Sequence, residues 1–394
     1  MVEFWTGIGN ASPRDIADTA ARAENDGWDG MVLYDSQCIF GEAFVMMTAA
    51  AIATDRLQLS LSTSNPVLRH PAVAASAVAT IQDLAGNRIR FGVGRGDSSL
   101  AHVGAAPAST KMFERYVTAV RHYLRGDAVA FDDITEWQLT DDVSTLRLAH
   151  APEASRLGWL APDMEPAPVD VYATGPRVLG VAGRTADGVV LSVGADVARI
   201  TWAREVARAA REAAGLDADS LDVTAICVLG VSDDIPRARR SVDNVVASMA
   251  RFAVMSGTVV GPVTEAQQAV YDAVGRSYDM NRHGESGSQV NALTDEFIDN
   301  FAIVGAPERC VERLAELVDA GVTSFLLGTP QGDADAADVR DSYRGLVEEV
   351  LPMARARFGA PKPSSVRPAT PAAAPISVAQ TEKVGALPAE NHGV

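Results

Sequence analysis

Basic residues are scarce in this chain of 394 residues: 34 Lys and Arg stand against 51 Asp and Glu, a formal net charge of −17. This balance argues against nucleic-acid binding, because phosphate contacts need clustered Lys and Arg. It does not exclude an anionic small ligand held in a local basic pocket. The sequence therefore favours a small-molecule partner over a nucleic acid.

Long apolar segments are also absent, since no run reaches the roughly 18 residues that a membrane-spanning helix needs. The N-terminal residues MVEFWTGIG lack the basic start and the long apolar core of a signal peptide. We therefore expect neither a membrane span nor a secretion signal.

Cysteine is rare, with three residues that lie far apart: Cys38, Cys227 and Cys310. An odd number of distant cysteines fits a reducing cytoplasm better than a disulfide framework. Their spacing matches no metal site. We expect a cytoplasmic protein without a bound metal.

What the chain does contain is a repeated pairing of a strand with a helix. The hydrophobic content of 47% is ordinary for a globular protein, and the length allows one large α/β barrel or two smaller domains. Apolar strand segments recur about every 25–35 residues, the period of a βα unit, except across two interruptions. The expected strands are 3–8, 31–34, 57–62, 89–93, 169–173, 188–193, 221–231 and 323–327. Because eight strands alternate with helices and no GxGxxG follows the first, we predict a (β/α)8 TIM barrel.

Two segments interrupt this rhythm, one after strand 4 and one after strand 7. Residues 126–168 lack a helical period, and short strand-like pieces at 127–131, 135–139 and 145–149 predict a β-ribbon insertion. Residues 254–300 hold a probable helix, 265–274, and a polar loop, 276–288, typical of a lid or second insertion. We assign residues 1–357 to the barrel with its insertions.

The C-terminal residues differ in composition from the barrel. Residues 358–394 are rich in Pro and Ala and offer little apolar surface to bury. We expect a flexible tail.

Polar turns follow the ends of two neighbouring strands, where parallel α/β folds bind their ligands. The third strand is followed by Ser62-Thr63-Ser64-Asn65-Pro66, and the fourth by Gly94-Arg95-Gly96-Asp97. The two glycines expose backbone N–H groups to a ligand, Arg95 supplies charge, and Asp97 supplies a hydrogen bond or a proton. The alternatives are an Asn-Pro turn and a tight turn with an exposed arginine.

Thr174-Gly175-Pro176-Arg177 opens a helix directly after a strand. The free N–H groups of a helix N-terminus attract anions, and Arg177 adds positive charge, so we expect a phosphate site. The alternative is an ordinary helix that begins with proline.

Two further side chains have open assignments. Asp35 follows the second strand and serves either as a helix cap or as a ligand contact. His70 precedes a helix and lies either in the pocket or on its rim.

Together these turns resemble the bacterial luciferase-like superfamily, and within it the coenzyme F420-dependent reductases of the methylenetetrahydromethanopterin reductase type. The similar segments keep the same order over residues 1–357. They are DSQ (35–37), TSNPVLRHP (63–71), GVGRGDS (92–98), GPR (175–177), AGRTADG (182–188) and VGAPE (304–308).

This resemblance implies a barrel that binds F420, or alternatively FMN, at the C-terminal ends of its strands. It implies a ring over the end of strand three beside a non-prolyl cis peptide, Ser62–Thr63, a phosphate near 175–177, and a homodimer. The resemblance assigns catalysis to Asp97 and Asp35. It assigns cofactor binding to Ser62, Thr63, Ser64, Asn65, His70, Gly94, Arg95, Gly96, Thr174, Gly175, Pro176 and Arg177.

One departure narrows the function. F420-dependent sugar-phosphate dehydrogenases carry an Asp-His pair after strand two, with the histidine as base, whereas this chain has Asp35-Ser36. The resemblance therefore disfavours sugar-phosphate dehydrogenation by that mechanism. The two insertions are expected to shape the pocket for an organic substrate.

Three functions remain open from the sequence. The first is hydride transfer between F420 and an organic substrate, which depends mainly on positioning. The second is an FMNH2-dependent monooxygenase that receives reduced flavin from a partner reductase and must exclude water. The third is a non-catalytic barrel that binds a ligand.

Overall fold

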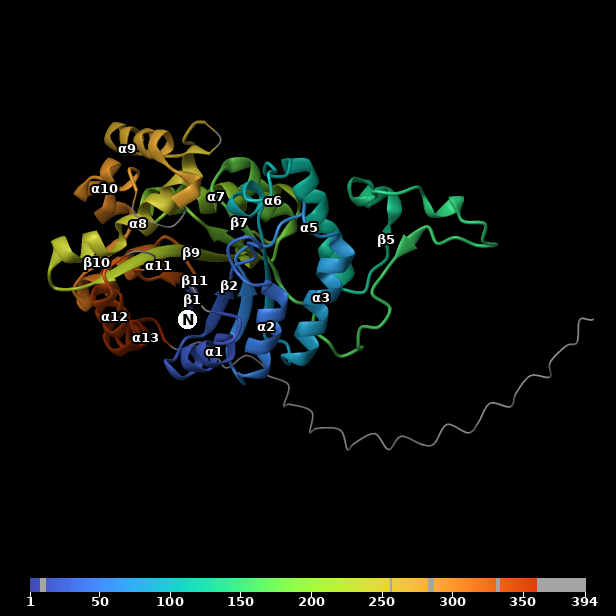
Figure 1. Ribbon diagram of the computed structural model, residues 1–394, viewed down its shortest axis with the longest axis horizontal. Coiled ribbons are helices and arrows are strands. Elements are labelled where there is room, and N and C mark those ends of the chain that lie inside the picture. Colours follow the sequence, from blue (N-terminus) through green and yellow to red (C-terminus); the bar gives the residue numbers. More distant parts are fainter. Residues whose placement is uncertain (8–11, 256, 283–286, 331–333, 360–394) are drawn as a thin grey trace, which may run out of the picture.

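Eight parallel strands close into a barrel in the computed structural model, which describes residues 1–7, 12–255, 257–282, 287–330 and 334–359. Strand β9 pairs with both β8 and β11, and this double pairing closes the ring. Helices surround the barrel (Figure 1). The predicted TIM barrel is confirmed. The barrel strands are β1 (Glu3–Gly7), β2 (Gly30–Leu33), β3 (Gln58–Leu61), β4 (Ile89–Val93), β7 (Val169–Ala173), β8 (Gly188–Leu191), β9 (Asp222–Val231) and β11 (Ser324–Gly328).

The helices lie where apolar residues recur at helical spacing. In α5, Phe113, Val117, Val120 and Leu124 are all buried against the sheet, as the spacing predicts. Helix α1 begins at Ile16, and just before it the Ser12 hydroxyl donates to the Asp15 carboxylate at 2.6 Å. The helices around the barrel are α1 (Ile16–Asn25), α2 (Ala43–Ile52), α3 (Pro71–Leu84), α4 (Ser98–Ala101), α5 (Thr110–Leu124), α6 (Pro176–Thr185), α7 (Val197–Ala213), α8 (Ile235–Val254), α11 (Pro307–Asp319), α12 (Ala336–Gly345) and α13 (Leu351–Phe358).

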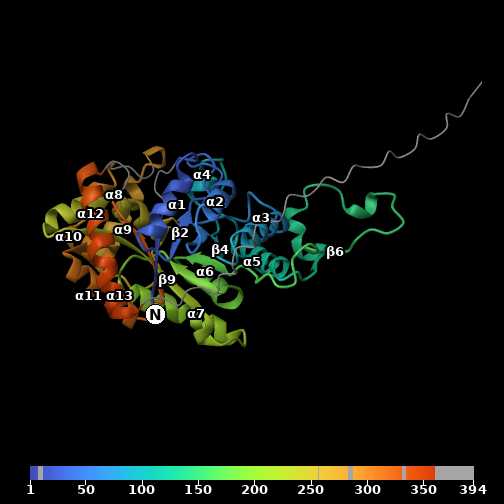
Figure 2. The ribbon, with the colours of Figure 1, turned by 90° about the horizontal axis from the view of Figure 1, so that it is seen from below.

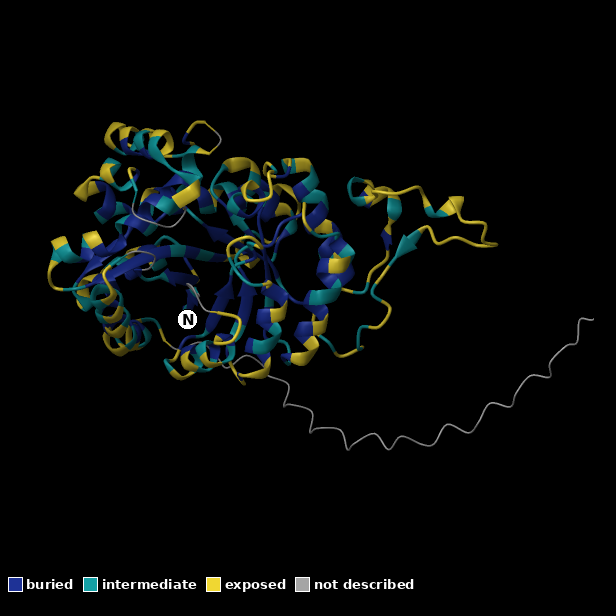
Figure 3. Cartoon of the chain, in the orientation of Figure 1, coloured by how far each residue is buried: buried dark blue, intermediate teal, exposed yellow. Residues whose placement is uncertain are grey.

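Side chains of alternate strand residues fill the inside of the barrel. Trp5, Val32 and Leu326 form a small interior cluster, and Tyr34 packs on it. Gly30 makes room for this cluster, because a Cβ there would lie 2.3 Å from the Trp5 ring. Larger apolar side chains point outward to the helices, which gives the buried centre in Figure 3.

The first insertion forms an arm with little regular structure. Only β5 (Val129–Ala130) and β6 (Ala154–Ser155) pair, in antiparallel fashion, so the strands predicted at 135–139 and 145–149 are wrong. Residues Phe131–Trp137 form a 3-10 helix instead, because Ile134 and Trp137 turn to the protein at helical rather than alternating spacing, with the Trp137 indole donating to the Pro66 carbonyl at 2.6 Å. The arm projects from the barrel in both views (Figures 1 and 2).

The second insertion builds a separate small core beside the top of the barrel. It contains α9 (Glu265–Ser277), α10 (Asp295–Phe301) and β10 (Ile303–Gly305), a short strand that sequence analysis did not identify and that pairs with β9. Part of the predicted polar loop, 283–286, and residues 360–394 of the predicted tail lie outside the described residues. Among the described helices, none combines the length and apolar character that a membrane crossing requires.

Candidate active site

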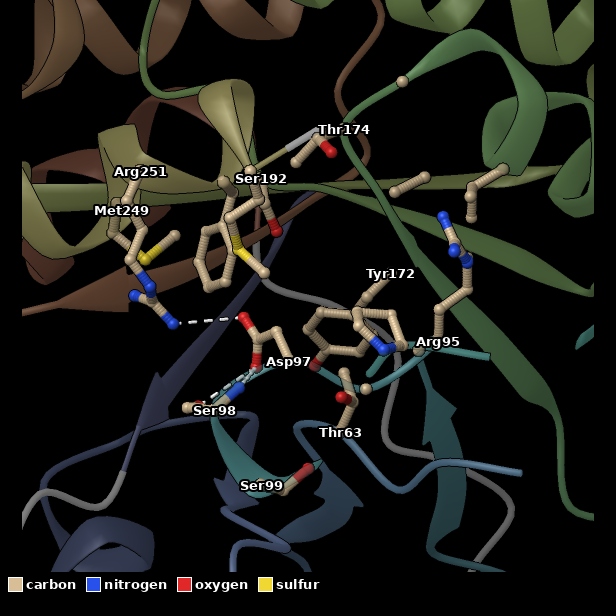
Figure 4. Close-up of a pocket in the computed structure, with 18 of the residues that line it drawn as sticks. Thr63, Arg95, Asp97, Ser98, Ser99, Tyr172, Thr174, Ser192, Met249 and Arg251 are labelled. Carbon is tan, nitrogen blue, oxygen red and sulfur yellow. Dashed lines mark hydrogen bonds and ion pairs between the residues drawn. The ribbon is translucent and has the colours of Figure 1, made fainter. Parts of the chain in front are cut away.

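A cavity of about 1310 Å³ opens at the C-terminal ends of the barrel strands (Figure 4). Its walls come from the turns after β2, β3, β4, β7 and β8 and from α8. Small-molecule sites usually measure about 300–1,000 Å³. The cavity therefore has room for two ligands, such as a cofactor and a substrate together.

The turn after β4 forms one side of the cavity. Gly96 has a φ of +86°, which glycine adopts easily and other residues rarely do. The Gly94 amide donates to the Ser64 carbonyl at 2.9 Å, and the Ser64 amide donates to the Gly92 carbonyl at 3.0 Å. These bonds hold the polar ends of β3 and β4 side by side.

The polar residues at the end of β3 have two roles. Some line the cavity, and others hold the turn behind it. The Ser62–Thr63 peptide bond is cis, as the resemblance implies, and both residues line the cavity. Ser64 and Asn65 are buried behind them. The Asn65 side-chain oxygen accepts from the amides of Val67 and Leu68 at 3.1 and 3.2 Å. Neither Ser64 nor Asn65 is among the lining residues, so they shape the turn.

Asp97 lines the cavity, but both of its carboxylate oxygens are engaged. One accepts from the backbone amide and the hydroxyl of Ser98, and the other lies 3.1 Å from a guanidinium nitrogen of Arg251. Arg251 is buried and stacks over the rings of Phe252 and Tyr278, 4.4 and 5.1 Å from its central carbon to their centroids. Asp97 is therefore an anchor between the glycine turn and α8.

Asp35 and His70 lie outside the cavity lining. Asp35 is buried, accepts from the Gln37 side chain at 2.5 Å and faces Arg69 at 3.7 Å. Burial raises the pKa of Asp35, and Ser64 and Arg69 offset part of that rise. The His70 ring caps α3 by accepting from the Ala72 amide at 3.1 Å, and burial lowers the pKa of His70. The structure thus gives both predicted site residues structural contacts instead.

Two arginines face the opposite part of the cavity at the start of α6. Thr174, Gly175, Pro176 and Arg177 all line it, and Arg95 approaches from the glycine turn. Burial and the neighbouring Arg177 charge lower the pKa of Arg95. Among the described residues, no carboxylate lies within salt-bridge distance of either guanidinium. The Arg95 guanidinium also donates to the Ala108 carbonyl at 2.5 Å. Two positive charges at a helix N-terminus, without a carboxylate partner among the described residues, favour the approach of an anion.

The remaining surfaces of the cavity are mainly aromatic and apolar, with uncharged hydroxyls between them. Tyr34, Tyr172 and Ile226 lie at the floor, above the barrel interior, and Ile39 and Phe40 follow β2. Burial raises the pKa of Tyr34 to about 12. Burial also raises the pKa of Tyr172, partly offset by the Ser62 side chain. Helix α8 and the residue after it add Val245, Ser248, Met249, Phe252 and Met255.

A family model described as luciferase-like monooxygenase matches residues 2–324. The chain belongs to this family. As a luciferase-like protein it is an oxidoreductase, and its barrel carries the cavity where parallel α/β enzymes place their sites.

Relatives of this luciferase-like chain include F420 enzymes. It is 28% identical over 341 residues to the 5,10-methylenetetrahydromethanopterin reductase of Archaeoglobus fulgidus, covering 84% of this chain and 92% of the relative. It is 27% identical over 360 residues to the F420-dependent glucose-6-phosphate dehydrogenase of Beutenbergia cavernae, covering 88% and 95%. The solved F420-dependent tetrahydromethanopterin reductase of Methanopyrus kandleri has the same fold, with a TM-score of 0.65 at 22% identity over 89% of this chain and 99% of that one.

Sequence reasoning about this luciferase-like enzyme missed Arg251 and the two floor tyrosines. Arg251 lies in α8 without a motif, 154 residues from Asp97. The tyrosines left a weak signal, because Tyr34 follows Val32 by two residues and therefore lies on the same face of β2. Strand alternation, continued past the strand end, would have directed Tyr34 into the barrel.

Proposed function

We propose that this enzyme binds F420 and transfers a hydride between the deazaflavin and an organic substrate. The observation that carries the proposal is the pair Arg95 and Arg177, which lack a carboxylate partner among the described residues and meet at the N-terminus of α6. In a chain with a formal net charge of −17, two arginines without a carboxylate partner at a cavity favour an anionic ligand. The phosphate of F420 supplies it.

The residues present fit this cofactor. The arginines, the N–H groups at the start of α6 and the Thr174 hydroxyl would hold the phosphate. The ring would lie beside Ser62, Thr63 and Gly94, where a Cβ on Gly94 would come within 3.0 Å of the Thr63 hydroxyl and narrow the space. When bound, F420 carries two electrons as a hydride.

The chain's own contribution is positioning and the exclusion of water. The rigid ends of β3 and β4 fix one wall, and the apolar side chains of α8 cover the other. Holding two reactants in a productive orientation is worth about 7–11 kcal/mol of barrier. This scheme needs neither a metal-bound water nor a protein nucleophile.

The names of the relatives favour F420 over FMN for this chain. A residue of this chain speaks against a sugar phosphate as substrate. Ser36 stands where the resemblance expects the histidine base of the sugar-phosphate dehydrogenases. We therefore propose a different organic substrate.

Equilibrium binding of F420 and of FMN to the purified protein tests the cofactor, followed by anaerobic reduction and an oxygen-uptake assay. We expect F420 to bind and FMN to bind weakly. Tight FMNH2 binding with oxygen uptake would replace the proposal by a monooxygenase that uses a partner reductase. Binding of neither cofactor would favour a non-catalytic barrel.

We also propose a cytoplasmic homodimer. Cys38, Cys227 and Cys310 are all unpaired, which suits a reducing compartment. Light scattering on the purified protein measures the oligomeric state, and a monomeric mass would contradict the dimer.

A further inference from the structure

Two glycines make room for the tyrosines at the floor of the cavity. A Cβ on Gly7, at the end of β1, would lie 2.6 Å from the Tyr34 hydroxyl oxygen. A Cβ on Gly92, in β4, would lie 1.8 Å from the Leu61 carbonyl oxygen and 2.8 Å from the edge of the Tyr172 ring, so Gly92 serves the close approach of β3 as well as the phenol. Gly7 does not have a positive φ, so the space for the Tyr34 hydroxyl explains the glycine at position 7.

The two phenols differ in their partners. The Tyr172 side chain interacts with Ser62. Tyr34 packs against Phe40 with the rings tilted by 43° and their centroids 5.3 Å apart, and it lines the cavity. Within the part of the chain that the structure describes, the Tyr34 hydroxyl has no hydrogen-bond partner. Tyr34 is partly buried, and a phenol that is largely removed from solvent usually has such a partner, so we expect the partner in the cavity.

Asp97 is a poor source of a proton for a ligand in this cavity. Its carboxylate accepts from Ser98 through one oxygen and from Arg251 through the other. Arg251 in turn donates to the Ser248 carbonyl at 2.6 Å. The Tyr34 phenol, by contrast, remains protonated at neutral pH, because burial holds its pKa near 12.

Among the described lining residues, no charged side chain remains for a charged substrate. Arg251 is neutralised by Asp97, and Arg95 and Arg177 are taken by the cofactor phosphate in the proposed function. Apolar side chains after β2 and on α8 supply much of the remaining surface, namely Ile39, Phe40, Val245, Met249, Phe252 and Met255, together with uncharged hydroxyls such as those of Ser192 and Ser248. Such walls accept an uncharged organic molecule.

We infer that the substrate is an uncharged, largely apolar carbonyl compound and that Tyr34 is the catalytic residue that hydrogen-bonds and protonates its oxygen. This inference rests on the proposed function. In the reduction, the carbonyl carbon receives a hydride with both electrons, the C=O π bond breaks, and the oxygen takes the Tyr34 proton to give an alcohol. The hydride comes from the reduced deazaflavin, which is oxidised by two electrons and also releases one proton. Water entering the cavity returns a proton to the phenolate, and the hydroxide left behind is neutralised by the proton that the deazaflavin releases.

The first test observes the hydrogen bond without turnover. Acetophenone labelled with ¹³C at its carbonyl is added to the full-length protein, with and without oxidised F420, and its carbonyl stretch is recorded by infrared difference spectroscopy. We expect a shift to lower frequency in the wild type and its loss in Tyr34→Phe. An unshifted band in the wild type, or the same shift in Tyr34→Phe, would overturn the inference.

The second test uses kinetics with reduced F420 and acetophenone. Tyr34→Phe is expected to lower kcat by about 10²–10⁴-fold, the usual contribution of a general acid, with little change in KM and in the affinity for F420. Tyr123→Phe is the matched control, since that tyrosine bonds Ser155 outside the cavity. A Tyr34→Phe enzyme that keeps its kcat, or one that loses only F420 affinity, would contradict a role on the substrate.

A Gly7→Ala variant separates the hydroxyl from the ring. The new Cβ displaces the hydroxyl, so Gly7→Ala should lower kcat in the wild type and add little in the Tyr34→Phe background. Equal effects in both backgrounds would mean that Gly7 acts on the fold instead. The melting temperature of each variant reports folding independently.

Phenylglyoxylate tests the substrate class, because it is an aryl ketone that carries a carboxylate. We expect a much higher kcat/KM for acetophenone, and a preference for phenylglyoxylate would contradict the uncharged class. Failure to bind F420 would sink the proposed function, whereas the infrared shift in the cofactor-free protein still decides the role of Tyr34.

Discussion

The Arg251 guanidinium lies 3.1 Å from the Asp97 carboxylate and joins α8 to the glycine turn after β4. The Arg251 side chain is 6% exposed and that of Asp97 25% exposed, so solvent screens the pair only in part. The pair connects the wall of the cavity that faces the substrate to the wall expected to hold the cofactor. The contribution of this ion pair to the free energy of unfolding can be measured without an activity assay.

Arg251→Gln should lower the unfolding free energy by about 2–4 kcal/mol, because removing one partner leaves the other charge with poor compensation. Urea denaturation measures the change. The double variant Asp97→Asn/Arg251→Gln should recover part of the loss. Arg208→Gln, which breaks an exposed pair with Asp219, serves as the control and should change little. Equal losses for the two arginines would contradict this assignment.

Arg177→Ala should weaken F420 binding by about 1–3 kcal/mol, the loss of a charge-assisted hydrogen bond. Isothermal titration calorimetry gives the dissociation constants. Arg184→Ala is a matched control on the same helix, because Arg184 pairs with Glu114 at 2.8 Å and does not line the cavity. An unchanged affinity for Arg177→Ala would place the phosphate elsewhere.

Gly96→Ala should destabilise the fold by about 1–3 kcal/mol, since a non-glycine residue at positive φ is strained. The added Cβ would also lie 2.4 Å from Leu100. Gly158→Ala is the comparison, because nothing lies within 4 Å of a Cβ there. Thermal denaturation of both variants measures the difference, and similar melting temperatures would argue against a strained turn.

His70 should make stability depend on pH. Its pKa is lowered in the folded state by burial, so the unfolded chain binds the proton more readily near its ordinary pKa of about 6.5. The unfolding free energy should therefore be fully present above that value and fall as the pH drops through it, because a protonated Nδ1 cannot accept from Ala72. His70→Asn keeps a capping acceptor that does not titrate. The wild type should lose more stability than His70→Asn between about pH 7 and pH 5, and parallel curves would refute the assignment.

The sequence predicted all eight barrel strands, because their signals are local. Each strand is a short apolar run that ends at a turn residue, and each helix shows its stripe within a few turns, as Phe113 and Val117 do in α5. The helix starts at Pro71 and Pro176 were equally readable. The arm was misread because Ile134 is buried and Trp137 partly buried by contacts outside their own segment.

The sequence predicted the candidate site only in part. It placed the polar turns at the correct strand ends, but not every predicted side chain lines the cavity. Thr63, Arg95, Asp97 and Arg177 do line one cavity, whereas Asp35, Asn65 and His70 lie outside its lining. A carboxylate or an imidazole looks the same in sequence whether it caps a helix or faces a ligand. The neighbouring backbone amides decide between these roles.

The sequence by itself determined the barrel and the strand ends at which its chemistry collects, because hydrophobic period and turn residues act over a few residues. Only the tertiary structure decided which polar side chains bond within the protein and which are available to a ligand. It paired Asp97 with Arg251 across 154 residues, brought Arg95 to Arg177 without a counterion among the described residues, and left the Tyr34 hydroxyl to the cavity. These outcomes depend on tertiary packing: β4 and β7 pair side by side and bring Arg95 to Arg177, whereas α8 follows β9 and meets the turn after β4 only at the mouth of the barrel.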